Sequence, residues 1–406
     1  MDALARIESS LADAVLSAET SGTPPRLAAA LRHAVFPKGA RIRPRLTLAV
    51  AAACGDDQPR LASAAASAIE LLHCASLVHD DLPCFDDADM RRGRPSVHRA
   101  FGEPLAVLAG DALIVLAFQT VARAGCGAPE RLGPVINAIG DGVGVPFGIV
   151  AGQAWECEPR ADLSEYQRQK TGALFAAASV AGAAAAIELL HCASLVHDDL
   201  PCFDDADMRR GRPSVHRAFG EPLAVLAGDA LIVLAFQTVA RAGCSAPERL
   251  GPVINAIGDG VGVPFGIVAG QAWECEPRAD LSEYQRQKTG ALFAAASVAG
   301  AAAAGVADAE AWRLLGDRLG EAFQVADDLR DAVEDEASIG KPVGRDKALG
   351  RPSAVLQLGL DGAVARLKTL ANAAVEAIPD CPGRALLRAA MLEEVGRLLP
   401  RKLAAV

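Results

Sequence analysis

The chain has 406 residues and a formal net charge of −10, and 51% of its residues are hydrophobic although only 4% are aromatic. This length fits two average domains or one large domain, and the abundance of alanine and leucine favours helix. The acidic balance, without a basic tail or stripe, excludes nucleic acid as the main partner, because phosphate contacts need many clustered cations. The net charge does not exclude small phosphorylated ligands, which need only a local basic cluster. We therefore expect an all-α protein.

The cysteines and the apolar stretches indicate the compartment. The ten cysteines are dispersed, with no C-x-x-C pair, which is typical of reduced thiols in a cytoplasmic protein. The N-terminus "MDALARIESSLADAV" lacks the cationic start and apolar run of a signal peptide. The apolar stretch 173–187 is shorter than a bilayer span, so we predict a buried helix there. We expect a cytoplasmic protein without an integral membrane segment.

A long internal repeat dominates the organisation of the chain. Residues 69–186 (copy 1) and 187–304 (copy 2) differ only at Gly127, which is replaced by Ser245. A period of 118 residues is too long for a solenoid unit, so we infer a recent duplication or an error of assembly. Removing one copy leaves 288 residues, the size of a single helical enzyme. The predicted segments are N-terminal helices with a basic motif (1–68), copy 1, copy 2, and C-terminal helices (305–406).

The first acidic cluster follows an apolar helix. Pro83 disfavours helical geometry at the residue before it, so we predict that the helix ends there with Asp80 and Asp81 in its last turn. Three more aspartates follow, and five carboxylates within ten residues repel one another unless a cation intervenes. An acidic run alone is usually a solvated loop, but here Arg91, Arg92 and Arg94 come next. Mg²⁺ prefers carboxylates together with phosphate oxygens, and arginine binds phosphate bidentately, so the combination predicts a metal–diphosphate site.

Two later stretches follow in chain order. "GDGVGVPFG" (140–148) is predicted to be a loop or helix break, without the G-K-[ST] ending of a phosphate-binding P-loop. "LLGDRLGEAFQVADDLRDAV" is predicted to be an amphipathic helix. Its apolar stripe comprises Leu319, Ala322, Ala326, Leu329 and Val333.

The face opposite this stripe carries the second acidic cluster. Asp327 and Asp331 are four residues apart and share that face with Gln324, while Asp328 lies next to Asp327. An ordinary solvated helix face has the same pattern, but Lys341, in a Gly-Lys-Pro turn, again places a cation after the acids.

Two aspartate-rich motifs with these flanks resemble the trans-isoprenyl diphosphate synthases, the polyprenyl synthetase family, and are most similar to bacterial geranylgeranyl diphosphate synthases of carotenoid biosynthesis. "DDLPCFD" (Asp80 to Asp86) looks like the first motif in its longer DDxxxxD form, and "FQVADDLRD" looks like the second, DDxxD. "AGQ" and "KTG" match positions that contact the allylic diphosphate, and His73 matches a histidine associated with isopentenyl diphosphate. The N-terminal motif departs from the family's GGKRxRP, because it reads "KGARIRP" with Ala40 in place of the lysine.

The resemblance implies an isoprenoid synthase-type helical bundle around a central cavity, with one duplicated helical segment, and a homodimer. It implies about three Mg²⁺ ions per active site. The implied metal ligands are Asp80, Asp81, Asp86, Asp327, Asp328 and Asp331, with Asp198, Asp199 and Asp204 as the copy 2 counterparts. The implied diphosphate-binding residues are Lys38, Arg41, Arg43, His73, Arg91, Arg92, Gln153, Lys170, Thr171, Gln324 and Lys341, and in copy 2 His191, Arg209, Arg210, Gln271, Lys288 and Thr289.

The implied reaction condenses isopentenyl diphosphate with an allylic diphosphate (dimethylallyl, geranyl or farnesyl) by ionisation, condensation and elimination. Small residues before the first motif imply a deep tail pocket and a C20 product, geranylgeranyl diphosphate: these are Ala75 and Ser76, and in copy 2 Ala193 and Ser194. The alternatives are a farnesyl diphosphate synthase, a class I terpene cyclase, and a non-catalytic protein disrupted by the duplication.

The duplication bears on the number of sites. There are two first motifs but one second motif and one N-terminal basic motif, so a chain can assemble at most one complete site. Either copy, or a mixed arrangement, could supply the first motif. We expect the surplus copy to occupy the family's dimer interface within the chain or to swap between chains.

Overall fold

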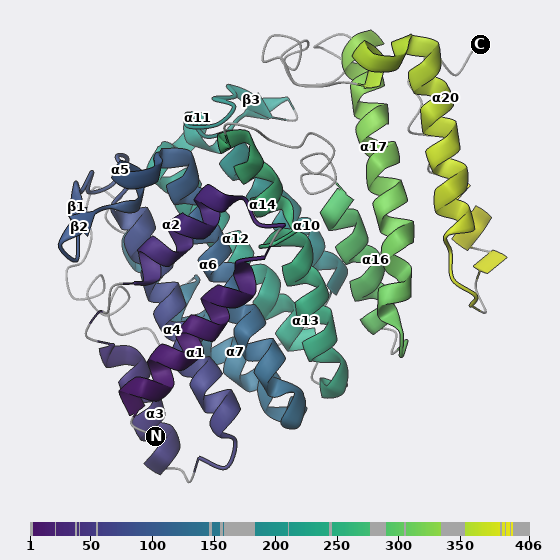
Figure 1. Cartoon of the computed structure of the whole chain (residues 1–406). Helices are drawn as coiled ribbons and strands as arrows, with labels where there is room; N and C mark the ends of the chain where they lie inside the picture. The colour runs from purple at the N-terminus through teal and green to yellow at the C-terminus, as the bar shows by residue number, and fades with distance from the viewer. Residues whose placement is uncertain are drawn as a thin grey trace.

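The structure is a computed structural model, and it describes residues 3–20, 22–36, 39, 41–53, 56–145, 148–154, 157, 183–209, 211–242, 246–276, 290–303, 306–333, 354–381, 384–385, 387–389 and 391–392. Within these residues the regular structure is helical apart from two short hairpins (Figure 1). The all-α prediction is therefore confirmed.

The N-terminal helices are α1 (Ala3–Ala18), α2 (Pro25–Val35) and α3 (Ile42–Ala53). Helix α1 buries Ile7, Leu11 and Ala14 on one face, at the spacing of an amphipathic helix. This face packs on the long helix α4 (Pro59–Asp80), which enters copy 1. The N-terminal helices are thus attached to copy 1.

Copy 1 continues from α4 through a hairpin into a helical layer. The hairpin turns at Arg92 and Gly93, whose φ values of 51° and 78° suit a two-residue turn that only glycine and a few other residues adopt readily. The elements after α4 are β1 (Met90–Arg91), β2 (Arg94–Pro95), α5 (Val97–Phe101), α6 (Glu103–Ala124), η1 (Gly125–Gly127), α7 (Pro129–Val143) and α8 (Ile149–Ala154).

Copy 2 repeats these elements, and the C-terminal helices follow it. Its elements are α10 (Ala183–Asp198), β3 (Met208–Arg209), β4 (Arg212–Pro213), α11 (Val215–Phe219), α12 (Glu221–Ala242), α13 (Pro247–Val261), α14 (Ile267–Ala272), η4 (Trp273–Cys275) and α16 (Ala291–Ala303). The last elements are η6 (Ala309–Trp312), α17 (Arg313–Val333) and α20 (Ala354–Glu376). Helix α17 packs between α16 and α20, so the C-terminal helices are attached to copy 2.

The two copies pack against each other with an approximate two-fold relationship. Helix α6 lies against α13, and α12 lies against α7. Gln119 Nε2 donates to Asp259 Oδ1 at 2.9 Å, and its counterpart Gln237 donates to Asp141 Oδ1 at 2.9 Å. The rings of Phe118 and its own counterpart Phe236 stack with centroids 4.9 Å apart. Contacts that repeat in both directions define an isologous interface, here formed within one chain.

One sequence-based prediction about this layer was partly wrong. The stretch 140–148 was predicted to be a loop or helix break, but α7 continues through Val143. A Cβ atom at Gly140 would lie 2.4 Å from the side chain of Gln237, so the glycine lets α12 approach closely. Packing against the second copy therefore holds residues in a helix that their composition disfavours.

Three helices, α4, α6 and residues 221–241 of α12, are long and apolar enough to cross a membrane. Their apolar surface is largely buried among other helices, and 94% of the most apolar window of α6 is buried. A helix that is apolar on all sides is also what the core of a large helical protein requires. The cysteines whose side chains are described are free thiols.

Candidate functional site

The first acidic motif of copy 1 lies where α4 ends, as predicted from Pro83. Helix α4 ends at Asp80, and Asp81 caps it. The loop then folds back, since the backbone N–H of Asp86 donates to the carbonyl oxygen of Asp80 at 3.0 Å. This turn brings the first and last aspartates of the motif to the same helix end. Their carboxylate oxygens are the donors that Mg²⁺ prefers.

Other acids of the cluster are engaged by arginines. Asp81 is buried, and Arg91 Nε donates to its Oδ1 and Oδ2 at 2.8 and 3.1 Å. Arg99 binds both Asp87 and Asp89, at 2.9 and 2.7 Å. These pairs reduce the repulsion among the five carboxylates. Asp80 and Asp86, the first and last aspartates of the motif, are its candidate metal ligands.

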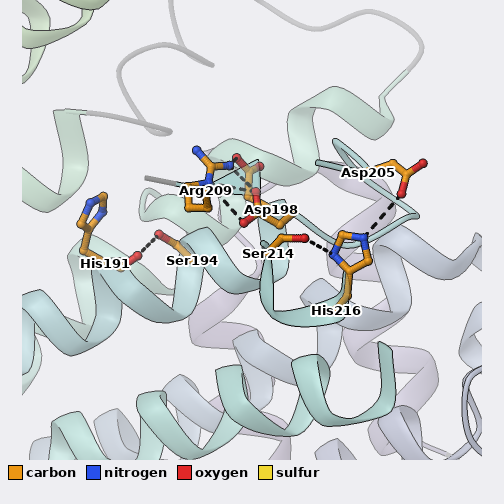
Figure 2. A network of polar contacts seen from close by, with 8 residues as sticks. His191, Ser194, Asp198, Asp205, Arg209, Ser214 and His216 are labelled. Carbon is orange, nitrogen blue, oxygen red and sulfur yellow. Dashed lines mark hydrogen bonds and ion pairs between the residues drawn. The ribbon is translucent and has the colours of Figure 1, made fainter. Parts of the chain in front are cut away.

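Copy 2 builds the same motif geometry (Figure 2). Arg209 Nε donates to Asp199 at 2.9 and 3.2 Å, and its guanidinium lies 4.0 Å from Asp198. The N–H of Asp204 donates to the carbonyl of Asp198 at 3.0 Å. Two equivalent first motifs are therefore present, and the motif geometry alone does not distinguish the copies.

A basic cluster surrounds the first motif in copy 1. Burial, followed by the charges of Arg43, Arg92, Arg91 and Arg41, lowers the pKa of His73 to about 4. A pocket between α2, α4 and the β1–β2 hairpin is lined by Asp81, Cys74 and the three arginines Arg91, Arg92 and Arg94. The excess of positive charge suits a diphosphate.

Within this cluster, Arg41 is engaged in ion pairs inside the protein. Its side chain is fully buried, and it donates to Glu70 at 2.6 Å and to Glu8 at 3.0 Å. Arg92 also lies 3.6 Å from Glu70. Buried charges need such partners, and this network fixes α3 on α4. Arg41 therefore positions the basic motif, and Arg43, which is half-buried, is the candidate to contact a ligand.

The second motif lies on α17, whose predicted apolar stripe is confirmed by the burial of Ala322, Ala326 and Leu329. Asp328 is buried, accepts from Gln324 Nε2 at 3.1 Å, and accepts from the backbone N–H of Ala354 at 2.7 Å. It thus holds the first turn of α20. Asp327 is half-buried; the side chain of Asp331 lies outside the described residues.

The parts of the predicted site are divided between the two copies. The N-terminal basic motif packs on α4 of copy 1, whereas α17 packs on α16 of copy 2. Figure 1 shows α1 to α3 on one side of the molecule and α17 and α20 on the other. The ring contact between Phe293 of α16 and Phe323 of α17, with centroids 5.3 Å apart, fixes the second motif beside copy 2.

The remaining predicted residues fall into two groups. Gln153 and Gln271 are buried in α8 and α14, Ala75 and Ala193 are buried in α4 and α10, and Ser76 and Ser194 donate to the carbonyls of His73 and His191 at 2.9 Å. Several predicted residues lie outside the described part of the chain: Lys38, Lys170, Thr171, Arg210, Lys288, Thr289 and Lys341.

Sequence reasoning missed the polar pairs between the copies. His79, next to Asp80, lies 2.8 Å from Asp229, and His197 lies 2.8 Å from Asp111. The available signal was a single aspartate in the otherwise apolar helices α6 and α12, since a buried charge demands a partner.

Comparison with known proteins agrees with the motifs. The profile of the polyprenyl synthetase family matches residues 24–186 and again 179–381. The geranylgeranyl diphosphate synthase of Cereibacter sphaeroides is 38% identical over 400 residues that cover 98% of each chain. The enzyme of the same name from Rhodobacter capsulatus is 37% identical over 94% of this chain and 91% of that one. Among solved structures, a geranyltransferase from Helicobacter pylori complexed with magnesium and isoprenyl diphosphate is 26% identical, covering 69% of this chain and 94% of that one with a TM-score of 0.48.

Proposed function

The chain belongs to the polyprenyl synthetase family, and from this premise we propose that it is a Mg²⁺-dependent prenyltransferase that forms geranylgeranyl diphosphate from isopentenyl diphosphate and an allylic diphosphate. The observation that carries the proposal is the junction of acids and arginines at the end of α4. Asp80 and Asp86 are brought together there, and Arg43, Arg91 and Arg92 surround His73.

Each group of residues has a role that follows from its chemistry. Asp80 and Asp86, or Asp198 and Asp204 in copy 2, together with Asp327, offer the hard oxygen donors that would hold Mg²⁺. When bound, the ion supplies positive charge that stabilises the departing diphosphate. Arg91 or Arg209 is held by its buried aspartate, so the guanidinium is oriented before substrate binds.

The second substrate is assigned to the basic cluster. The pKa of His73, lowered to about 4, keeps its ring neutral at pH 7, so the ring can donate one hydrogen bond without adding charge. Arg43 and Arg92 then supply the cations for the diphosphate of isopentenyl diphosphate. After the allylic C–O bond breaks, the double bond of this substrate attacks C1 and a proton is lost.

The C20 product is proposed from the small residues that precede the motif. Ala75 and Ala193 are each only 2% exposed, and they lie one helical turn or more before Asp80 and Asp198. The small side chains at these helix positions support a tail pocket deep enough for twenty carbons. We also propose a cytoplasmic location, in keeping with the free thiols. We propose further that the product is a carotenoid precursor.

A non-catalytic role is the second candidate, because the basic motif and the second acidic motif are attached to different copies. The decisive experiment is incorporation of labelled isopentenyl diphosphate into product with farnesyl diphosphate as primer, with Mg²⁺ and after its removal by EDTA. The enzymatic proposal predicts a C20 product that forms only in the presence of Mg²⁺. Folded protein that incorporates no label overturns the enzymatic proposal and favours the non-catalytic one.

A further inference from the structure

Identical residues are covered in copy 1 and open in copy 2. Glu70 and Cys74 of α4 are buried, whereas their counterparts in α10 differ: Glu188 is exposed and Cys192 is half-buried. Since the local sequences are the same, the difference arises from what packs on the helix. In copy 1 the covering elements are α1 and α3, and the buried Glu70 receives Arg41.

The hairpin and the following helix show the same difference. In copy 1 the rings of Phe101 and His33 of α2 meet edge to face with centroids 5.3 Å apart, whereas Phe219 of copy 2 is 69% exposed. Arg94 donates to the carbonyl of His33 at 3.1 Å, whereas its counterpart Arg212 is exposed. Copy 2 therefore presents an open face, formed by Glu188, Cys192, Arg212 and Phe219, that matches the surface already bound by α1–α3.

We propose that this open face of copy 2 binds helices α1–α3 of a second copy of this chain. The occupant is identified by the repeat itself, because the same residues in copy 1 bind these helices within the chain. The contacts that would form are those already seen: Arg41 to a glutamate, now Glu188, and His33 to a phenylalanine, now Phe219. The negative charge of Glu188 and the positive charge of Arg41 are complementary.

This exchange completes the active site between chains, and this consequence rests on the proposed function. Helix α17 already packs on copy 2, which carries Asp198 and Asp204. What copy 2 lacks is the basic motif with Arg43, and the exchanged helices bring it next to His191. Each complete site then contains α1–α3 of one chain and copy 2 with α17 of the other.

The exchange costs little because it replaces contacts with equivalent ones, as in other domain swaps. A substrate pair that needs the basic motif and both acidic motifs binds only the completed site. Its binding energy therefore shifts the population toward the exchanged dimer.

Complementation between two inactive full-length variants tests the shared site. One variant carries Arg43→Glu, and the other carries Asp327→Ala with Asp331→Ala. In a mixed exchanged dimer, the basic motif of the second variant meets the intact copy 2 and α17 of the first. After unfolding and refolding together, we expect activity to recover to about a quarter of wild type, by random pairing of chains. No recovery, in a protein whose wild type is active, overturns the proposal.

A matched pair shows which helices are exchanged. The Asp327→Ala, Asp331→Ala variant is mixed with an Asp198→Ala, Asp204→Ala variant. The first pair of substitutions lies in the C-terminal helices and the second pair lies in copy 2. Exchange of α1–α3 leaves every site damaged, and we expect no recovery. Recovery here means that the C-terminal helices pass to copy 1 of another chain, and it overturns the proposal as well.

Mass in solution tests the docking without using activity. We expect twice the chain mass of 41.8 kDa by light scattering in the presence of Mg²⁺ and inorganic diphosphate. Phe219→Asp should lower the dimer fraction, whereas Phe101→Asp, which weakens docking within the chain, should raise it. A wild-type monomer under all conditions, or equal effects of the two variants, overturns the docking. Loss of label incorporation with this mass pattern intact would overturn the proposed function alone.

Discussion

Nδ1 of His79 in copy 1 lies 2.8 Å from Oδ2 of Asp229 in copy 2, while Nε2 of the same ring lies 3.1 Å from the carbonyl oxygen of Val107. His197 and Asp111 repeat the contact at 2.8 Å. A carbonyl oxygen only accepts hydrogen bonds, so Nε2 of His79 donates to Val107, and the charge of Asp229, which raises the pKa of His79, favours a proton on Nδ1 as well. Two buried imidazolium–carboxylate pairs therefore join the copies.

The first prediction concerns the contribution of these pairs to stability. Burial alone would lower the pKa of His79, but the charge of Asp229 and its hydrogen bond outweigh burial and raise the pKa. Asp229→Ala leaves a buried cation without its partner, so we expect the free energy of unfolding to fall by about 3–5 kcal/mol. The measurement is the urea midpoint with its slope. Asp111→Ala should cost about the same, because its surroundings are the same.

The control for this prediction is Asp207→Ala. Asp207 is 78% exposed and pairs with Arg217 at the surface, where solvent screens the attraction. We expect little change in the urea midpoint for this variant. Equal effects of the Asp207 and Asp229 substitutions would show that the pairs between the copies do not stabilise the fold.

The second prediction concerns pH at the approximate two-fold axis, where Glu221 meets its own counterpart Glu103. Burial, then the charge of Glu103 and a hydrogen bond with it, raises the pKa of Glu221 to about 7. A raised carboxyl pKa contributes stability below its unfolded value, and this contribution is lost as pH rises through about 7. We expect Glu221→Gln to lose less thermal stability than wild type between pH 5 and 9.

The measured quantity is the difference in melting temperature between variant and wild type at each pH, because other groups titrate as well. Glu248→Gln serves as a control, since Glu248 is exposed and forms an ion pair with its neighbour Arg249. Its difference from wild type should stay constant across the range. A constant difference for Glu221→Gln too would contradict the raised pKa of Glu221.

Local features of this protein were predictable from sequence, and distant ones were not. Pro83 fixes the end of α4, and a period of 3.6 residues identifies the buried stripe of α17, because both depend on neighbouring residues. The partner of His79 lies 150 residues away, in a second copy of a segment that also contains Asp111. Identical copies have identical local signals, so the pairing between them depends on tertiary packing alone.

The candidate site shows the same division. The motifs predicted which residues would gather at the end of α4, and the structure brings Asp80, Asp86 and Arg91 to that end. The sequence did not determine which copy packs against the N-terminal basic motif and which packs against α17, because both copies present the same residues. The attachment follows chain connectivity: α3 leads directly into α4 of copy 1, and α16 of copy 2 leads toward α17.

The third prediction concerns His73. Burial, followed by the charge of Arg43 and the other arginines, lowers its pKa to about 4. A depressed histidine pKa contributes stability above its unfolded value near 6.5, and this stability is lost as pH falls toward 4. Inorganic diphosphate should raise the pKa, because it offsets the arginine charges. Histidine NMR, with His73→Gln for assignment, measures the titration. Arg43→Gln should raise the pKa without ligand, and a free His73 that titrates near 6.5 would contradict the basic cluster.

The fourth prediction links product length to the working copy. Ala75 and Ala193 are buried, so a tyrosine at either position places a ring in the proposed tail pocket, and overpacking of this kind costs about 1–3 kcal/mol. If copy 2 forms the site, Ala193→Tyr should shift the product from C20 toward C15, whereas Ala75→Tyr should still give C20. Chromatography of labelled products measures the lengths, and circular dichroism confirms that each variant folds. The opposite pattern would assign the site to copy 1, and a wild-type product of C15 would contradict the pocket argument itself.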